Sequence, residues 1–200
     1  MTSAARDPSI EPSGYSAPLR RFSRAEYDSL VESGFFAEDE KVELLDGVIT
    51  SMTPQGHRHS APILRLNMLL APALAGRAAV GVQLPFAASD VSEPEPDLFI
   101  VPLSELEDDG EHPSQAYCII EISVTSQARD RAKVGIYARA NVPQLILIDV
   151  QRREARIYRG PRDGDYKNIQ TLDEGARVVI DAFPDVGFDL AAVLPKSPAT

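Results

Sequence analysis

Two carboxylates stand beside apolar runs that are typical of buried strands, and no other feature of the sequence is better suited to chemistry. Asp97 precedes the run Leu98–Val101, and Glu121 lies inside the run Cys118–Ile122. An ionised carboxylate is stable among such residues only when it is paired, hydrogen-bonded or bound to a cation. For either acid alone, a water-exposed strand end is the simpler interpretation. Taken together, the two acids indicate an oxygen-ligand site for a hard metal ion.

A polar stripe follows on the helix that we expect directly after the second acid. Asp130, Lys133 and Tyr137 are spaced i, i+3 and i+7, so they share one helix face. Another apolar run comes next, and the order strand, helix, strand predicts a crossover unit. Such a unit places Glu121 and the polar stripe at the same end of a partly parallel sheet.

In order and spacing, several blocks of the chain resemble the Uma-two family of restriction-endonuclease-like proteins, within the PD-(D/E)xK nuclease superfamily. The similarity extends from about Phe22 to Leu194. It implies an α/β (α+β) fold with a restriction-endonuclease-like αβββαβ core, a mixed central sheet, an N-terminal helix and hairpin, and C-terminal β additions. The blocks are Glu43-Leu44-Leu45-Asp46-Gly47, His59 before an apolar helix, Glu95-Pro96-Asp97, Ile120-Glu121-Ile122-Ser123, Asp130-Arg131-Ala132-Lys133 with Tyr137, and Val142-Pro143 before a strand.

The resemblance also implies a function and a set of metal ligands. The function is that of a metal-dependent endonuclease, a hydrolase that cuts phosphodiester bonds in DNA with Mg²⁺ or Mn²⁺. Asp97 and Glu121 would bind the ion, and the backbone carbonyl of Ile122 would add a third oxygen. Glu43 is the best candidate for an extra acid, which would bind a second ion or hold a metal-bound water.

The catalytic lysine is where the chain departs from the superfamily pattern. The usual ExK motif would place lysine at position 123, where this chain has Ser123. The resemblance moves the lysine role to the following helix, onto Lys133, which would orient or deprotonate water. The simpler interpretation of Lys133 is an ion pair with Asp130 or Glu121.

Four further residues are candidates for lining the site, each with a simpler structural explanation. His59 comes before an apolar helix and is otherwise a helix-start contact; His57 is a weaker candidate. We place Gln83 in a strand beside the site, where a hydrogen bond at the core edge is the default. Tyr137 packs or hydrogen-bonds structurally in the simpler interpretation, and Asp130 pairs with the lysine.

The overall charge of the chain disfavours binding to DNA. The net charge is -10, with 30 acids against 20 bases, and it repels phosphate at long range. Five arginines close after the crossover form either a phosphate-contacting edge or ordinary surface residues of a hairpin: Arg152, Arg153, Arg156, Arg159 and Arg162. A nuclease-fold protein that binds nucleic acid or a protein partner without cutting is therefore the second hypothesis. A purely structural oligomerising domain is the third.

The rest of the composition describes an ordinary globular chain. One cysteine, Cys118, permits no internal disulfide and lies in an apolar run, so we expect it in the core. The sequence has no membrane-length apolar segment and no N-terminal signal pattern, which predicts a cytoplasmic protein without a membrane partner. DNA is the expected partner, and a homodimer stays open.

Turn signals and hydrophobic periodicity predict one domain, residues 22–194, between a flexible N-terminal tail, 1–21, and a loose C-terminal end, 195–200. The first helix starts at a capping box formed by Ser23 and Glu26. The other expected elements are a hairpin over 43–52, a helix over 60–75 with an earlier end at Pro72 as the alternative, strands over 79–86, 96–101 and 117–124, a helix over 128–140, a strand over 144–150, a hairpin of 155–159 with 166–170, and a strand over 177–180.

Overall fold

The structure is a computed structural model that describes residues 20–52, 56–107, 110–124 and 127–196, and in the last range it describes side chains from residue 132 onward. The predicted tail over 1–21 and end over 195–200 lie largely outside these ranges. Of the helices described, none is long and apolar enough to cross a membrane.

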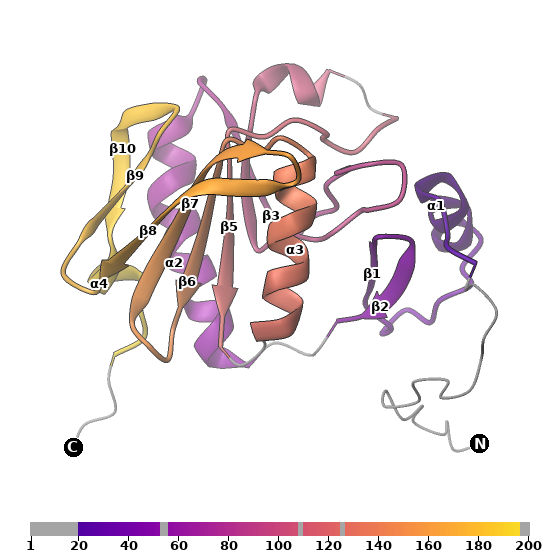
Figure 1. Cartoon of the computed structure of the whole chain (residues 1–200), viewed down its shortest axis with the longest axis horizontal. Helices are drawn as coiled ribbons and strands as arrows, with labels where there is room; N and C mark the ends of the chain where they lie inside the picture. The colour runs from indigo at the N-terminus through magenta and orange to yellow at the C-terminus, as the bar shows by residue number, and fades with distance from the viewer. Residues whose placement is uncertain (1–19, 53–55, 108–109, 125–126, 197–200) are drawn as a thin grey trace.

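A mixed six-stranded sheet forms the centre of the domain, with the strand order β3-β4-β5-β6-β7-β8 (Figure 1). Only β5 and β6 run parallel; every other neighbouring pair is antiparallel. Helix α3 (Gln127–Arg139) connects these two parallel strands, which confirms the predicted crossover. The strands are β3 (Ala79–Val82), β4 (Leu98–Val101), β5 (Cys118–Ser123), β6 (Gln144–Asp149), β7 (Glu154–Arg162) and β8 (Asp165–Asp173).

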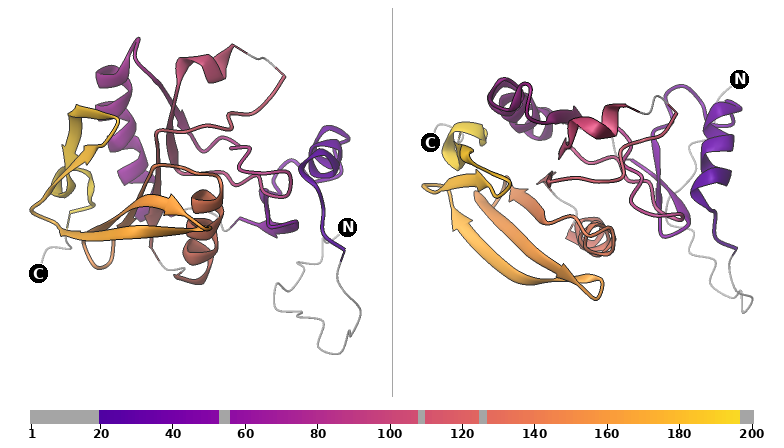
Figure 2. Two further views of the ribbon diagram at one scale, coloured as in Figure 1. Left: turned by 45° about the horizontal axis from the view of Figure 1, so that its top comes forward. Right: turned by 90° about the horizontal axis from the view of Figure 1, so that it is seen from above.

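Helices cover both faces of this sheet (Figure 2). On one face, α2 (His57–Leu74) packs with a small sheet of β9 (Arg177–Ile180) and β10 (Phe183–Asp189) and with the short helix α4 (Leu190–Val193). On the other face, α3 packs against alternate residues of the same strands. The strands are therefore buried on both sides, as their uninterrupted apolar runs predict.

The N-terminal elements lie beside α3, at the margin of the domain (Figure 1). Helix α1 (Arg24–Glu32) begins at the predicted capping box, in which the Ser23 hydroxyl accepts a hydrogen bond from the Glu26 amide. Strands β1 (Val42–Leu45) and β2 (Val48–Ser51) form the predicted hairpin around Asp46-Gly47. Both turn residues have positive φ, as a two-residue hairpin turn requires. A β-bridge between Leu44 and Glu93 fixes the hairpin against the domain.

Two boundary predictions were wrong, and one strand was not predicted. Helix α2 begins at His57 and continues past Pro72. Because proline has no amide hydrogen, the Met68 carbonyl lacks its hydrogen-bond donor within the helix. Met68 is 69% exposed, so water can donate the missing hydrogen bond. Strand β3 ends at Val82, so Gln83 lies after the strand, with φ at 50°. Strand β10 was not predicted, because a register shift between Phe183 and Gly187 disrupts the alternating pattern.

Gly81 in β3 provides a test of the packing between β3 and β4. A Cβ at this position would lie 2.1 Å from the Phe99 ring. Because this contact would force the ring out of its place, we expect Gly81→Ala to lower the free energy of unfolding by about 1–3 kcal/mol. Gly175→Ala is the matched control, since its Cβ meets Asp173 at an ordinary 3.5 Å. Urea unfolding measures both; equal stability of the two variants would contradict this packing.

Candidate functional site

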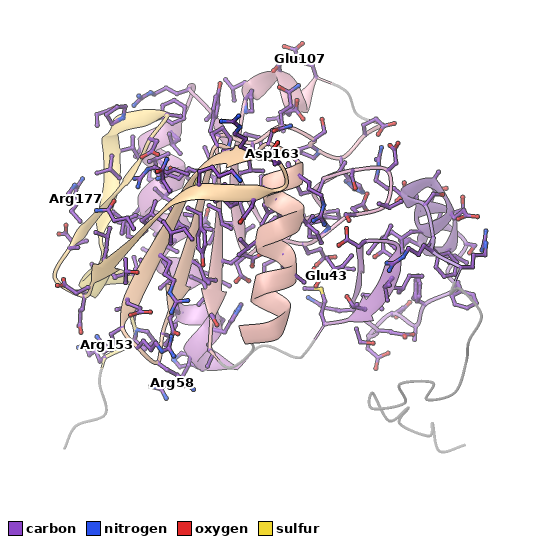
Figure 3. All side chains as sticks on the ribbon, viewed as in Figure 1. Glu43, Arg58, Glu107, Arg153, Asp163 and Arg177 are labelled. Carbon is purple, nitrogen blue, oxygen red and sulfur yellow. The ribbon has the colours of Figure 1, made fainter. Side chains whose placement is uncertain are left out.

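The candidate site lies at the end of the sheet where β5 finishes and where both α2 and α3 begin (Figure 1). Antiparallel pairing of Leu98 with Ile120 places Asp97, just before β4, level with the end of β5 that carries Glu121. Lys133 approaches from α3 and His59 from the first turn of α2. Strand β1 adds Glu43, which Figure 3 shows beside the lower half of α3. Five elements that are distant in sequence thus bring their polar side chains to one place.

Asp97 is held in a fixed orientation by three neighbours. Its Oδ2 accepts a hydrogen bond of 2.8 Å from the Ile122 amide, and the same oxygen lies 3.1 Å from Nε2 of His59. Its Oδ1 accepts a longer bond of 3.5 Å from Nε2 of Gln83. The residue is 5% exposed, so these contacts replace most of its water.

Lys133 is buried between two acids. Its Nζ lies 3.0 Å from Oε2 of Glu43 and 3.2 Å from Oε1 of Glu121, and it donates to the Glu95 carbonyl at 3.2 Å. Glu43 is fully buried and also accepts a hydrogen bond from the Glu95 amide at 3.2 Å. Burial lowers the pKa of Lys133, but the charges of Glu121 and Glu43 outweigh it, so the pKa is raised overall. The amine is therefore a stable ammonium ion at neutral pH.

Glu121 is the acid of this cluster whose charge is least stabilised. Tyr137 donates a hydrogen bond of 2.6 Å to its Oε1, the oxygen that Lys133 also contacts. Burial is the main cause that raises the pKa of Glu121, the charge of Lys133 opposes it and the charge of Asp97 adds to it, so that the pKa is raised to about 7. Burial also raises the pKa of Tyr137, which keeps the phenol a hydrogen-bond donor. Negative charge is thus in surplus around Glu121.

Burial and the Asp97 contact act in opposite directions on His59. Burial lowers the pKa of the imidazole, but the hydrogen bond to Asp97 and the charges of Asp97 and Glu121 together outweigh this, so the pKa is raised overall. Its Nδ1 is buried and has no hydrogen-bond partner within the described residues. The ring therefore faces Asp97 through one nitrogen and leaves the other unsatisfied.

The donor chemistry of these residues fits a hard divalent cation. Asp97 and Glu121 offer carboxylate oxygens, which Mg²⁺ and Mn²⁺ prefer, and a cation would offset the surplus negative charge. Within the described ranges, no three His, Cys, Asp or Glu side chains are already grouped to hold a metal. Lys133 and His59 contact the same carboxylates, so a bound ion would share the oxygens with them.

Seven of the side chains that the sequence singled out meet here: Glu43, His59, Gln83, Asp97, Glu121, Lys133 and Tyr137. Their roles in binding or catalysis stay predictions. Gln83 reaches Asp97 from a turn and not from the predicted strand. Ile122 contacts Asp97 through its amide, and metal binding by its carbonyl stays a prediction. The side chain of Asp130 lies outside the described residues.

The ion-pair partner of Lys133 differs in part from the simpler interpretation, and one contact was not predicted at all. Lys133 pairs with Glu121, as that interpretation holds, but its shortest ion pair is with Glu43, from a distant hairpin. The Glu95 carbonyl was missed as an acceptor. The sequence held one indication of this contact, Pro96, because proline favours extended backbone at the residue before it, here Glu95.

The arginines after the crossover are engaged within the protein, which favours the simpler of the two interpretations. Arg153 pairs with Glu174, and Arg159 makes two hydrogen bonds to Asp181 at 2.6 and 2.9 Å. The other three also have acidic neighbours within 4 Å: Arg152 near Asp149 and Glu154, Arg156 near Glu154, and Arg162 near Asp163. Binding of phosphate by this stretch would require these pairs to open.

The ion pair between Lys133 and Glu43 predicts strong coupling in stability. Lys133→Met leaves Glu43 buried without a counter-charge, so we expect the free energy of unfolding to fall by about 3 kcal/mol or more. Adding Glu43→Gln removes that stranded charge and is expected to recover about 1–3 kcal/mol. Denaturant unfolding of the wild type, both single variants and the double variant measures the coupling. Additive effects of the two substitutions would show that the pair is not formed.

The comparisons with known proteins agree with this fold. Residues 24–192 match the family Uma2, described as putative restriction endonuclease. A solved structure, described as a putative nuclease belonging to DUF820 from Anabaena variabilis ATCC 29413, superimposes with a TM-score of 0.69. The two sequences are 17% identical, and the match covers 86% of this chain and 97% of the other. No curated protein matches the chain. The chain belongs to the Uma2 family of putative restriction endonucleases, and its fold is that of a nuclease.

Proposed function

We propose that the protein is a divalent-metal-dependent endonuclease that hydrolyses phosphodiester bonds in DNA and acts in the cytoplasm. The observation that carries the proposal is the convergence of Asp97, Glu121 and Lys133 at one end of the sheet. Phosphodiester hydrolysis needs oxygen ligands for a hard cation and a positive group close to the attacking water. Two carboxylates beside a buried ammonium ion supply both requirements.

Asp97 and Glu121 would hold Mg²⁺ or Mn²⁺, which when bound polarises the phosphate and lowers the pKa of a water. The Ile122 amide keeps the Asp97 carboxylate oriented, and the Tyr137 hydroxyl does the same for Glu121. Each of these two contacts reduces the reorganisation that ligand binding would otherwise require. Tyr137 is therefore a positioning residue in this proposal.

Lys133 would orient the attacking water and stabilise negative charge that develops on the phosphate. Because its pKa is raised, the amine acts as an ammonium ion rather than as a neutral general base. Glu43 lies 3.0 Å from the ammonium and is fully buried, which supports a role in holding Lys133 over a role in binding a second ion. A fixed ammonium ion acts on charge without having to reorganise.

A nuclease-fold protein that binds without cutting is the alternative. The net charge of -10 and Ser123 in place of the usual lysine favour it. Under this alternative the acids and Lys133 form a structural network, and metal is not needed. A second copy of the chain, in a homodimer, stays a prediction that sedimentation would test.

Metal dependence is the first prediction of the proposal. We expect the wild type to bind Mg²⁺ and Mn²⁺ in titration calorimetry and to cut DNA only when one of them is present. Asp97→Asn and Glu121→Gln preserve side-chain size but weaken the ligands, so both should lose binding and cleavage. Asp163→Asn is the control, because Asp163 is exposed, lies on a distant turn and is labelled in Figure 3. Unchanged metal affinity in both site variants would remove the proposed ligands.

The substrate follows from a scan of single-stranded DNA, double-stranded DNA and RNA with each ion. The proposal expects cleavage of DNA with little sequence preference. Retained nucleic-acid binding without cleavage under any condition would favour the non-catalytic alternative.

The displaced lysine gives a second prediction. Lys133→Ala is expected to lower turnover by about 100-fold or more, the range for loss of a group that positions or transfers a proton. Ser123→Ala should be mild. Ser123 ends β5 close to Glu121, so Ser123→Lys in the Lys133→Ala background should restore part of the activity. Circular dichroism must first show that each variant is folded at the assay temperature. Full activity in Lys133→Ala would return this lysine to a purely structural ion pair.

A further inference from the structure

Most cationic side chains of the described chain are neutralised by its own acids. Arg77 makes two hydrogen bonds to Asp185, at 2.6 and 2.9 Å. Arg139 likewise makes two to Asp46, at 2.7 and 2.8 Å. Arg65 donates to two backbone carbonyls near α4. Such groups cannot bind an external phosphate without giving up an internal partner, which offsets much of the gain. Cations that are free of such partners are therefore the best candidates for binding an anionic substrate.

Arg58 is such a cation and lies on the same helix turn as a residue of the candidate site. It is exposed on the first turn of α2, directly before His59, whose Nε2 is 3.1 Å from Asp97. Its guanidinium makes no ion pair or hydrogen bond with any residue whose side chain is described. Figure 3 shows Arg58 at the lower end of the molecule, where α2 begins and β5 ends.

Lys41 is a second such cation near the same cluster. It is exposed, directly precedes β1 and lies two residues before Glu43. No acidic partner for its amine is found in the described part of the chain. Its charge is nevertheless felt inside the cluster: burial raises the pKa of Glu95, and the charge of Lys41 opposes that rise.

We infer that Arg58 and Lys41 bind the backbone phosphates next to the scissile one and so position nucleic acid in the site. The inference rests on the proposed function. Successive phosphates rise by about 3.4 Å along a strand, so a cation adjacent to a site-lining residue meets a phosphate close to the reacting one. Phosphate contacts set register without reading sequence, so these two residues would not select a base sequence. Both residues are positioning residues and take no part in the chemistry.

These two contacts also answer the objection raised by the net charge of -10. Long-range repulsion opposes approach, but it is screened beyond about 10 Å at ordinary ionic strength. At short range the substrate meets two unpaired cations and a metal-neutralised carboxylate cluster. Local charge then decides binding. We therefore expect the DNA affinity to depend only weakly on salt concentration, and this dependence to come from few residues.

The test measures DNA affinity as a function of salt by fluorescence anisotropy, with Ca²⁺ in place of Mg²⁺ and with the labelled strand checked for integrity. Between about 50 and 200 mM salt, Arg58→Ala and Lys41→Ala should each reduce the slope of log K against log[salt] by about one. Each should weaken binding about three- to tenfold at the lowest salt. Ca²⁺ affinity, measured by calorimetry, should be unchanged in both. Lys167→Ala is the matched control. Lys167 is exposed and lies on β8, an edge strand that is separated from β5 by two strands of the sheet.

The outcomes separate this inference from the function on which it rests. Wild-type slopes in Arg58→Ala and Lys41→Ala, with DNA bound normally, would overturn the inference and leave the nuclease proposal intact. An equal loss in Lys167→Ala would also overturn it, because binding would then be diffuse. A wild type that binds metal but neither DNA nor RNA would remove the proposed function and the inference with it.

Discussion

The ammonium group of Lys133 between two buried carboxylates is the interaction on which the rest of the site depends. Glu43 has no exposed surface and Glu121 very little, so neither could remain charged in this place without a close counter-ion. The contact joins α3 to β5 and to the N-terminal hairpin. The hairpin and the site are thus linked through one side chain. The N-terminal hairpin is therefore part of the nuclease-like domain, because it supplies the acid that lies closest to the lysine.

The fold contributes the remaining constraints through its register. Pairing of β4 with β5 brings Asp97 onto the Ile122 amide, so a peptide group fixes one proposed ligand. The crossover through α3 brings Tyr137 and Lys133 onto the other, Glu121. Burial is the main cause of the raised pKa of Glu121, and the charges of Asp97 and Glu43 add to it. The acids thus carry an excess of negative charge over the positive charge that the protein places among them. A divalent cation is the simplest species that would balance it.

Local patterns were enough to predict much of this arrangement. The capping box at Ser23, the Asp46-Gly47 turn and the crossover around α3 rest on short-range rules, and all three are confirmed. The sequence rules failed where distant contacts decide. Helix α2 passes Pro72 because that face is exposed, and a bulge hides β10. Spacing on one helix identified Lys133 and Tyr137, whereas the Glu43 and Glu95 contacts with the lysine join segments that no local pattern relates.

The central claim is that Asp97 and Glu121 together bind a divalent cation beside Lys133. Anomalous diffraction from crystals soaked in Mn²⁺ tests it most directly, since the anomalous signal locates the ion itself. We expect one strong peak within about 2.0–2.3 Å of oxygens from both carboxylates, the range for a small hard cation. A peak confined to other acids, or no peak at these two carboxylates at saturating Mn²⁺, would contradict it.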